Sequence, residues 1–221
     1  MSSVLGVDEI RPAAVVIDMH RGHLDPSVAT MPLGPEEAAR VVESSQQFLA
    51  ECRGRGLPVV HILTAYREAA EISANPFWRT AADNPASTRR SVLEHNLIGS
   101  PGCNVMEQLL DPADIIVATK KRYDCFRATD LDFTLRVHGV NTLLIAGVNT
   151  NSCVLSTTTA ACALDYAAVV IEDCVASMDG PALHDAALAC VRAAFGWTAN
   201  SADVWKILDD RPSSLPRSDG A

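Results

Sequence analysis

Five short apolar runs recur along the chain, each bounded by turn residues and separated from the next by a longer intervening stretch. The runs are nearly continuous in Val, Ile, Leu and Ala, as expected for strands of a parallel sheet that is covered on both faces. The alternation predicts an α/β fold, a doubly wound and mostly parallel sheet in a three-layer α/β/α arrangement. The predicted strands are Ala13–Asp18, Pro58–Thr64, Ile115–Thr119, Thr142–Gly147 and Ala167–Glu172.

The stretches between the strands carry helix signals. The segment Gly34–Glu37 places a proline and two acids in a first turn, and apolar residues at helical spacing then continue to a stop at Gly54–Gly56. Helices are therefore expected on both faces of the sheet. The other predicted helices are Leu131–Val137, Cys153–Leu164, Ala182–Phe195 and Ala202–Leu208.

The length and composition predict one domain. With 221 residues, 48% of them hydrophobic, the chain can bury a sizeable core, and we expect a single domain over residues 1–210. The end of the chain, Arg211–Ala221, is rich in Pro, Ser and Asp and is predicted to be disordered. The segment Tyr66–Pro101 is irregular and broken by prolines, and we expect it to cover a pocket.

The charge pattern argues against nucleic acid and against an anionic membrane surface as partners. The formal net charge is −9, and the only basic cluster, Lys120–Arg122, is too short for a binding stripe. No run approaches the roughly 20 apolar residues of a membrane span. The first residues, MSSVLGVDEIRP, lack the basic and then apolar pattern of a signal peptide, so we expect a cytoplasmic protein.

The seven cysteines do not form a recognisable framework. They contain no C-x-x-C pair, so neither a set of disulfides nor a thiolate zinc site is predicted, and six of them are interpreted as small buried hydrophobes. Cys153 differs because it follows an apolar strand and a G-V-N-T-N-S turn, where a helix is expected to begin. The positive end of a helix dipole is expected to lower the pKa of such a thiol, which makes Cys153 a candidate nucleophile.

Three reactive side chains follow predicted strands. Asp18 closes the first strand, Lys120 follows the third, and Cys153 lies just beyond the fourth. Ligands of open α/β sheets bind at this carboxyl edge, and a base, a cation and a nucleophile together suit acyl transfer. Taken alone, Asp18 could form a turn or cap a helix, Lys120 could be a solvated charge, and Cys153 could serve packing. Their coincidence at one edge favours catalysis.

Three motifs connect these residues to a known family. The segments AAVVIDMHRGHLDP, VATKKRYDCFRATDLDFTLRVHGVNTLLIAGVNTNSCV and VVIEDCVAS agree in order and spacing with the isochorismatase-like cysteine hydrolases, so the chain resembles that family over nearly the whole domain. The resemblance implies that Asp18, Lys120 and Cys153 form the catalytic set. The lysine is Lys120 because Tyr123 follows it by three residues. The resemblance also implies a cis peptide bond at Val148–Asn149.

The mechanism implied by this resemblance needs no cofactor. Asp18 takes the thiol proton, the Cys153 thiolate attacks an amide-type carbonyl, and the backbone N–H groups of Asn149 and Cys153 stabilise the oxyanion. Asp18 then protonates the leaving amine, and water hydrolyses the thioester. Lys120 is expected to hold the carboxylate in place.

Departures from the family pattern bear on the substrate and on metals. Where many members have D-x-Q-x-D-F, this chain has Asp18-Met19-His20-Arg21-Gly22-His23. His23 is predicted to contact the substrate, or alternatively to make a structural hydrogen bond, and His20 is a weaker candidate for the same role. The position of the nicotinamidase D-x-H metal element reads Thr64-Ala65-Tyr66-Arg67, so no metal is predicted.

Three further residues are candidate substrate contacts. Arg67 is predicted to clamp a substrate carboxylate, with a surface position as the alternative. Phe126 and Trp78 are predicted to form the pocket wall, although Trp78 could instead pack under the long loop or at a subunit contact. Asp124 is an unusual acid near the expected site.

The first functional hypothesis is a cysteine amidohydrolase that releases ammonia from a small linear amide or from an N-carbamoyl or ureido compound. The Phe195-Gly196-Trp197 segment is similar to carbamoyl- and ureido-type amidohydrolases of the family. One alternative is an isochorismatase-like vinyl ether hydrolase, which would use the Asp without the Cys. Another is a catalytically silent binding or scaffold protein. The resemblance also implies a homodimer or homotetramer.

Overall fold

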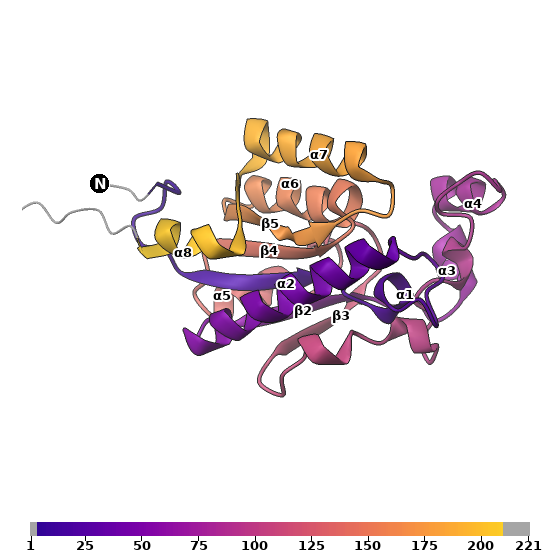
Figure 1. The fold of residues 1–221 in the computed structure, drawn as a ribbon, viewed down its shortest axis with the longest axis horizontal. Coiled ribbons are helices and arrows are strands. Elements are labelled where there is room, and N and C mark those ends of the chain that lie inside the picture. Colours follow the sequence, from indigo (N-terminus) through magenta and orange to yellow (C-terminus); the bar gives the residue numbers. More distant parts are fainter. Residues whose placement is uncertain (1–3, 210–221) are drawn as a thin grey trace, which may run out of the picture.

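The computed structural model describes residues 4–209, which form one sheet of six parallel strands in the order β3-β2-β1-β4-β5-β6 (Figure 1). The first five strands confirm the predicted ones to within a few residues, whereas the sixth spans three residues and is too short for its pattern to be recognised. The predicted disordered tail, Arg211–Ala221, lies outside the described residues. The strands are β1 Pro12–Ile17, β2 Val59–Thr64, β3 Ile115–Lys120, β4 Thr142–Val148, β5 Ala167–Ala176 and β6 Trp197–Ala199.

Every predicted helix is present, two of them with a turn of π-helix at one end. The predicted helix over Cys153–Leu164 begins with a π-turn at Thr150–Val154, and the one over Ala182–Phe195 ends with a π-turn at Val191–Phe195. No helix within residues 4–209 is long and apolar enough to cross a membrane. The helices are α1 Arg21–Leu24, α2 Pro35–Gly54, α3 Ala69–Ser73, α4 Pro76–Ala82, α5 Leu131–Val137, α6 Leu155–Ala163, α7 Pro181–Cys190 and α8 Ser201–Asp209, with short 3₁₀ turns at Val92–Glu94, Pro101–Cys103 and Glu107–Leu109.

Both faces of the sheet are buried. Successive residues of a strand point to opposite faces, so Val16 packs on one side with Phe48 of α2 and Trp205 of α8. Val15 packs on the other side with Leu188 of α7, in a cluster that also contains residues of α5 and α6. This distribution gives the predicted three-layer, doubly wound arrangement.

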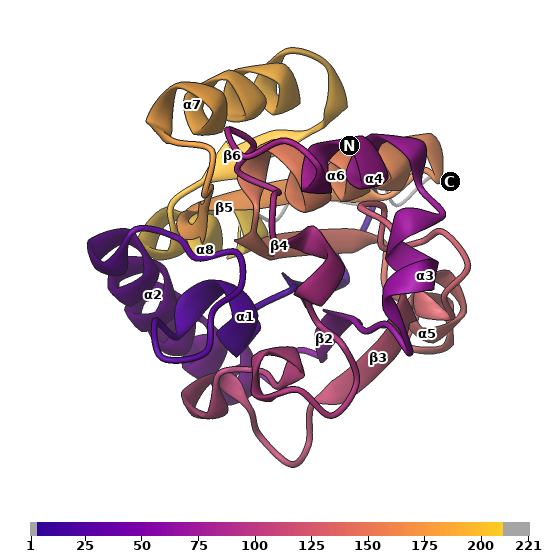
Figure 2. The ribbon, with the colours of Figure 1, turned by 90° about the vertical axis from the view of Figure 1, so that its right-hand side faces the viewer.

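The strand order places a crevice beside β1. From β1 the chain runs outward through β2 to β3 on one side, and it then crosses to β4 on the other side of β1. Ligands of such folds bind where the order reverses in this way. Asp18 follows β1 and the Thr150–Val154 turn follows β4, so both lie at this point. Figure 2 views this end of the sheet, with α1, α3 and α4 in front of it.

Gly147 lets β4 approach β1 closely at the same end. Its φ is +122°, and a Cβ atom there would lie 2.1 Å from the Ile17 carbonyl oxygen. Only glycine fits this contact, because any side chain would collide with backbone. The turns after the two strands are thereby held against each other.

Candidate active site

Asp18, Lys120 and Cys153 come together in one buried cluster. Asp18 follows β1 in the left-handed region, with φ +51°. Its Oδ1 accepts the Thr64 backbone N–H at 2.9 Å, and its Oδ2 accepts the Lys120 ammonium at 2.5 Å. The same Lys120 Nζ lies 2.7 Å from Thr64 Oγ1 and 3.3 Å from Cys153 Sγ. Lys120 therefore joins the carboxylate to the thiol.

Asp18 and Lys120 form an ion pair despite complete burial. Burial is the largest single effect on each pKa and acts against both charges, but the partner's charge, the other nearby charges and the hydrogen bonds together outweigh it. The pKa of Asp18 is consequently held well below its ordinary value, and the pKa of Lys120 is held well above its own. Both groups are charged at neutral pH.

Cys153 carries a thiol rather than a thiolate at neutral pH. It lies within the π-turn that precedes α6 and is 7% exposed. Burial raises the pKa of the thiol to about 12, although Lys120 acts in the opposite direction. The expectation that the helix dipole lowers this pKa is wrong, because the cost of removing a thiolate from water exceeds the local stabilisation.

The turn that carries Cys153 is fixed through Asn149. The Val148–Asn149 peptide bond is cis, as the family resemblance implies. The Asn149 side-chain oxygen accepts the Met178 N–H at 2.8 Å, and its carbonyl accepts the N–H groups of Ser152 and Val154 at 3.1 Å. Within residues 4–209, no acceptor takes the N–H of Asn149.

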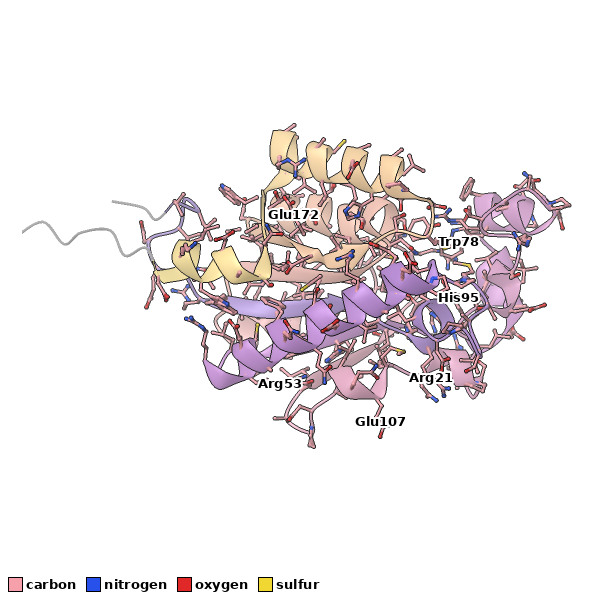
Figure 3. All side chains as sticks on the ribbon, viewed as in Figure 1. Arg21, Arg53, Trp78, His95, Glu107 and Glu172 are labelled. Carbon is pink, nitrogen blue, oxygen red and sulfur yellow. The ribbon has the colours of Figure 1, made fainter. Side chains whose placement is uncertain are left out.

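A pocket opens above this cluster. Asp18, Lys120, Asn149 and Cys153 contribute to its lining. The segment 66–101 provides one wall, which confirms the expectation that this segment covers the pocket. Its contributions are Tyr66, Trp78, Arg89, Val92 and His95. Figure 3 shows Trp78 and His95 at the same end of the molecule.

Two of the four predicted substrate contacts line the pocket. His23 reaches it from α1, and Trp78 reaches it from α4. The indole N–H of Trp78 donates to the hydroxyl oxygen of Tyr123 at 2.9 Å, and the two rings pack edge to face at 5.3 Å. Trp78 thus combines the two predicted alternatives, packing under the loop and facing the pocket.

Arg67 and Phe126 do not reach the pocket, which corrects their predicted placement. The Arg67 side chain is 78% exposed and pairs with Glu71 one helical turn later, so it takes the surface alternative. Phe126 stacks on Tyr166 with ring centres 5.8 Å apart, at the edge of the core. Asp124 caps its own turn by accepting the Phe126 N–H at 2.8 Å.

His23 and His95 form a buried pair in the pocket wall. His23 Nδ1 donates to the Met31 carbonyl at 2.7 Å, so His23 Nε2 is an acceptor for His95 Nε2–H, 3.1 Å away. His95 Nδ1 then accepts the Thr30 hydroxyl at 2.8 Å. Burial lowers the pKa of His23 to about 4 and holds that of His95 well below its ordinary value. Both rings are neutral at pH 7.

Two arginines line the pocket, and their guanidinium groups differ in their partners. Arg89 donates to both oxygens of Asp179, at 2.9 and 2.7 Å, and to Tyr123 at 3.0 Å. Arg122 donates to backbone carbonyl oxygens and lies 4.9 Å from the centre of the Trp78 ring. No carboxylate among residues 4–209 lies within ion-pair distance of Arg122. Arg122 is therefore a pocket cation whose charge the described chain does not neutralise.

Sequence reasoning missed these cations and the second histidine. Arg122 could have been noticed, because it follows Lys120 by two residues at the end of a predicted strand. Arg89 and His95 carry no such signal, since their positions depend on the path of the long segment between β2 and β3. Within the part of the chain that the structure describes, no group of three or more His, Cys, Asp or Glu residues is placed to hold a metal ion.

Comparisons with known proteins support the same relationship. Residues 12–203 match the family model of the isochorismatase domain. Ureidoacrylate amidohydrolase RutB of Variovorax paradoxus is 28% identical over 200 residues, covering 86% of this chain and 79% of the relative. RutB of Methylobacterium radiotolerans is 28% identical over 225 residues, covering 96% and 84%.

Solved structures share the fold. A cysteine hydrolase from Pseudomonas syringae pv. phaseolicola superposes with a TM-score of 0.77 at 22% identity, covering 91% of this chain and 94% of the other. N-carbamoylsarcosine amidase from Thermoplasma acidophilum gives 0.68 at 26% identity, covering 87% and 97%. Because the family model matches most of its length, this chain belongs to the isochorismatase family.

Proposed function

We propose that this chain is a cysteine amidohydrolase that cleaves a C–N bond of a small, acidic, linear amide, carbamoyl or ureido compound and releases ammonia. The observation that carries the proposal is the buried contact of Lys120 Nζ with both Asp18 and Cys153 at a pocket. The names of the relatives, ureidoacrylate amidohydrolase and N-carbamoylsarcosine amidase, support the enzyme class, a hydrolase of non-peptide C–N bonds.

The first step needs a base, because Cys153 rests as a thiol. Asp18 takes the proton as the sulfur attacks the carbonyl carbon, and the ammonium of Lys120 stabilises the developing thiolate. The S–C bond forms while the carbonyl π electrons move to oxygen. We assign the backbone N–H groups of Asn149 and Cys153 to this oxyanion, and each such donor contributes about 3 kcal/mol. The unsatisfied Asn149 N–H supports that assignment.

In the second step the C–N bond breaks. The leaving nitrogen takes the proton that Asp18 received, so ammonia departs as a neutral molecule and Asp18 is again a carboxylate. Water then attacks the thioester, giving its proton to Asp18, and the released sulfur recovers a proton from the same carboxyl group. Asp18 thus handles each proton in turn, while Lys120 remains bonded to it.

The pocket cations favour a substrate with a carboxylate. Arg122 lies in the pocket lining without a carboxylate partner from the described chain, so the substrate is proposed to bring one. This replaces the role that was predicted for Arg67. The neutral pair of His23 and His95 and the indole of Trp78 form an uncharged wall for the rest of a short molecule.

The decisive experiment measures ammonia release from carbamoyl, ureido and carboxamide compounds by wild type, Cys153→Ala and Asp18→Asn. We expect both variants to lose at least roughly 100-fold in kcat/KM. Cys52→Ala, which changes a buried cysteine of α2 far from the pocket, is the matched control. Full activity in Cys153→Ala would sink the thioester mechanism. Inactivity of the wild type on every compound would favour the scaffold alternative.

A trapping experiment tests the covalent intermediate directly. The exposed thiols of Cys162 and Cys190 would also react with iodoacetamide, so both are first changed to Ser. In this background, one equivalent of label on Cys153 should abolish activity, and substrate should protect against it. The acyl adduct on Cys153 is sought by mass spectrometry after an acid quench. The homodimer or homotetramer and the cytoplasmic location stay predictions.

A further inference from the structure

His20 is completely buried beside the carboxylate of Asp18, near Oδ1, whereas Lys120 binds Oδ2. Its Nδ1 lies 2.8 Å from the carbonyl oxygen of Cys103, in the 3₁₀ turn Pro101–Cys103. A carbonyl oxygen only accepts hydrogen bonds, so Nδ1 carries a proton. The other ring nitrogen, Nε2, lies 3.5 Å from Asp18 Oδ1 and has no hydrogen-bond partner within residues 4–209.

The protonation of Nε2 decides whether this contact is favourable. In a neutral ring with its proton on Nδ1, Nε2 presents a lone pair to a carboxylate oxygen, which is repulsive, and leaves a buried polar atom unsatisfied. In the imidazolium, Nε2 carries a proton and part of the positive charge, 3.5 Å from Asp18 Oδ1. That state turns a repulsive contact into an ion pair while Nδ1 keeps its hydrogen bond to Cys103.

A second buried histidine provides an internal comparison. His61 Nε2 lies 3.0 Å from Asp114 Oδ2, and the unpartnered nitrogen is the other one, Nδ1. A neutral ring with its proton on Nε2 satisfies that contact, so His61 needs no charge. The two histidines each have one unpartnered nitrogen, but only in His20 does this nitrogen face the carboxylate.

Among the buried histidines near the site, only His20 is free to carry a positive charge. The hydrogen bonds described above keep the His23 and His95 rings neutral. A positive charge on His20 further disfavours protonation of either ring. Asp18 supplies the counter-charge. The ionisable groups around His20 are Asp18 after β1, Lys120 in β3, His23 in α1, His95 in the loop before β3 and Cys103 in its 3₁₀ turn.

We propose that His20 is a positioning residue whose imidazolium holds Asp18 Oδ1, so that Oδ2 remains directed toward Lys120 and the thiol proton. The kinetic consequence rests on the proposed function. With two cations around one carboxylate, the cluster carries a net positive charge that offsets the thiolate formed at Cys153.

The charge itself is tested without any substrate. In wild-type protein labelled with ¹⁵N in the imidazole rings, NMR at neutral pH should show both nitrogens of His20 protonated and only one nitrogen of His61 protonated. The signals are assigned by their loss in His20→Gln and His61→Gln. A His20 ring with a proton on Nδ1 alone would overturn the proposal, whether or not the enzyme has the proposed activity.

The positioning role is tested by whether kcat changes while KM does not. His20→Gln keeps an N–H donor without the charge, so its kcat should be roughly tenfold lower than that of the wild type. His20→Leu removes the donor and should lose about 100-fold in kcat, with KM unchanged because His20 does not line the pocket. His61→Gln should keep the wild-type kcat and KM. Wild-type kcat in His20→Leu, or a KM that rises as kcat falls, would contradict the role.

Discussion

Two buried carboxylates in this molecule have similar partners but different surroundings. Asp18, at the carboxyl edge of the sheet, pairs with Lys120 and lies beside His20. Asp114, just before β3, pairs with Arg53 at the end of α2 and with His61. Figure 3 shows Arg53 well away from the end where Trp78 and His95 lie.

The difference lies in the cation. Arg53 grips Asp114 with two N–H groups, at 3.0 and 2.6 Å, and its planar fork has a fixed direction. Lys120 is a single point of charge with three donors, and it divides them among Asp18, Thr64 and Cys153. A shared ammonium can remain bonded while a proton moves between acid and thiol. The Asp114–Arg53 pair is therefore suited to stabilising the fold, and the Asp18–Lys120 pair is suited to catalysis.

Exchanging the cations for an apolar side chain should separate the two roles most clearly. Lys120→Met should lower kcat/KM by roughly 1000-fold, because the thiolate loses its counter-charge and burial then raises the pKa of Asp18. Arg53→Met should instead reduce the free energy of unfolding by about 3–5 kcal/mol, since it leaves Asp114 buried without its cation. Ammonia release per folded molecule and urea unfolding are measured on both variants.

The comparison fails if the effects are reversed. A stable Arg53→Met variant that has lost its activity would place Asp114 in the catalytic machinery. Wild-type kcat/KM in Lys120→Met would remove the lysine from the reaction.

The edge cluster could be predicted from the sequence because its geometry follows from the fold class. Parallel strands share one carboxyl edge, so the residues that end separate strands must meet there, and Asp18, Lys120 and Cys153 do. The strands themselves were visible as apolar runs. The short strand β6 gave too few residues for any pattern.

What could not be predicted depends on burial and on the path of a long loop. The raised pKa of Cys153 results from desolvation by tertiary neighbours, which a local helix argument ignores. His95 and Arg89 reach the pocket only through the course of the segment 66–101. The error over Arg67 was avoidable, because Glu71 follows it by four residues and offers it a nearby surface carboxylate.

The two ends of β4 offer a second contrast. Gly147→Ala should cost at least about 3 kcal/mol of stability, because its Cβ would lie 2.1 Å from the Ile17 carbonyl oxygen at the edge that holds the site. Gly139, before the strand, also has a positive φ, +65°, but its nearest atom would be 4.0 Å away. Gly139→Ala should therefore cost only about 1 kcal/mol.

Thermal unfolding of both glycine variants measures this contrast, and activity is assayed on the folded fraction. Equal losses in the two variants would mean that backbone conformation alone, rather than contact between β1 and β4, sets the requirement at Gly147.

Acid should lower the free energy of unfolding of the protein through His23. Its pKa is about 4 in the folded protein, whereas an unfolded histidine titrates near 6.5. Between these values the unfolded state binds the extra proton, so stability falls as the pH drops from about 6.5 to about 4, by roughly 3 kcal/mol. His23→Phe removes this contribution, and its unfolding free energy should fall less over that range.

Urea unfolding at several pH values measures this effect. His138→Gln, at an exposed position after α5, is the control and should follow the wild type. An acid loss in His23→Phe as large as that of the wild type would show that other groups carry the pH dependence.

Arg122 extends the comparison from the chain to its substrate. Arg53 has a carboxylate partner within the protein, whereas Arg122 lines the pocket and has none among residues 4–209. Arg122→Met should therefore raise KM for carboxylate-bearing amides by roughly tenfold to 100-fold and leave KM for neutral amides unchanged. Arg67→Met, at an exposed position outside the pocket, should change neither.

The contact of Arg122 with the Trp78 ring requires a second variant. Arg122→Lys keeps the charge but not the planar fork, so it should restore only part of the affinity for acidic substrates. If Arg122→Met raised KM equally for acidic and neutral substrates, the arginine would act by supporting Trp78 and the pocket wall. A rise in KM confined to acidic substrates would instead mean that the carboxylate of the substrate pairs with Arg122. The substrate would then play the part that Asp114 plays for Arg53.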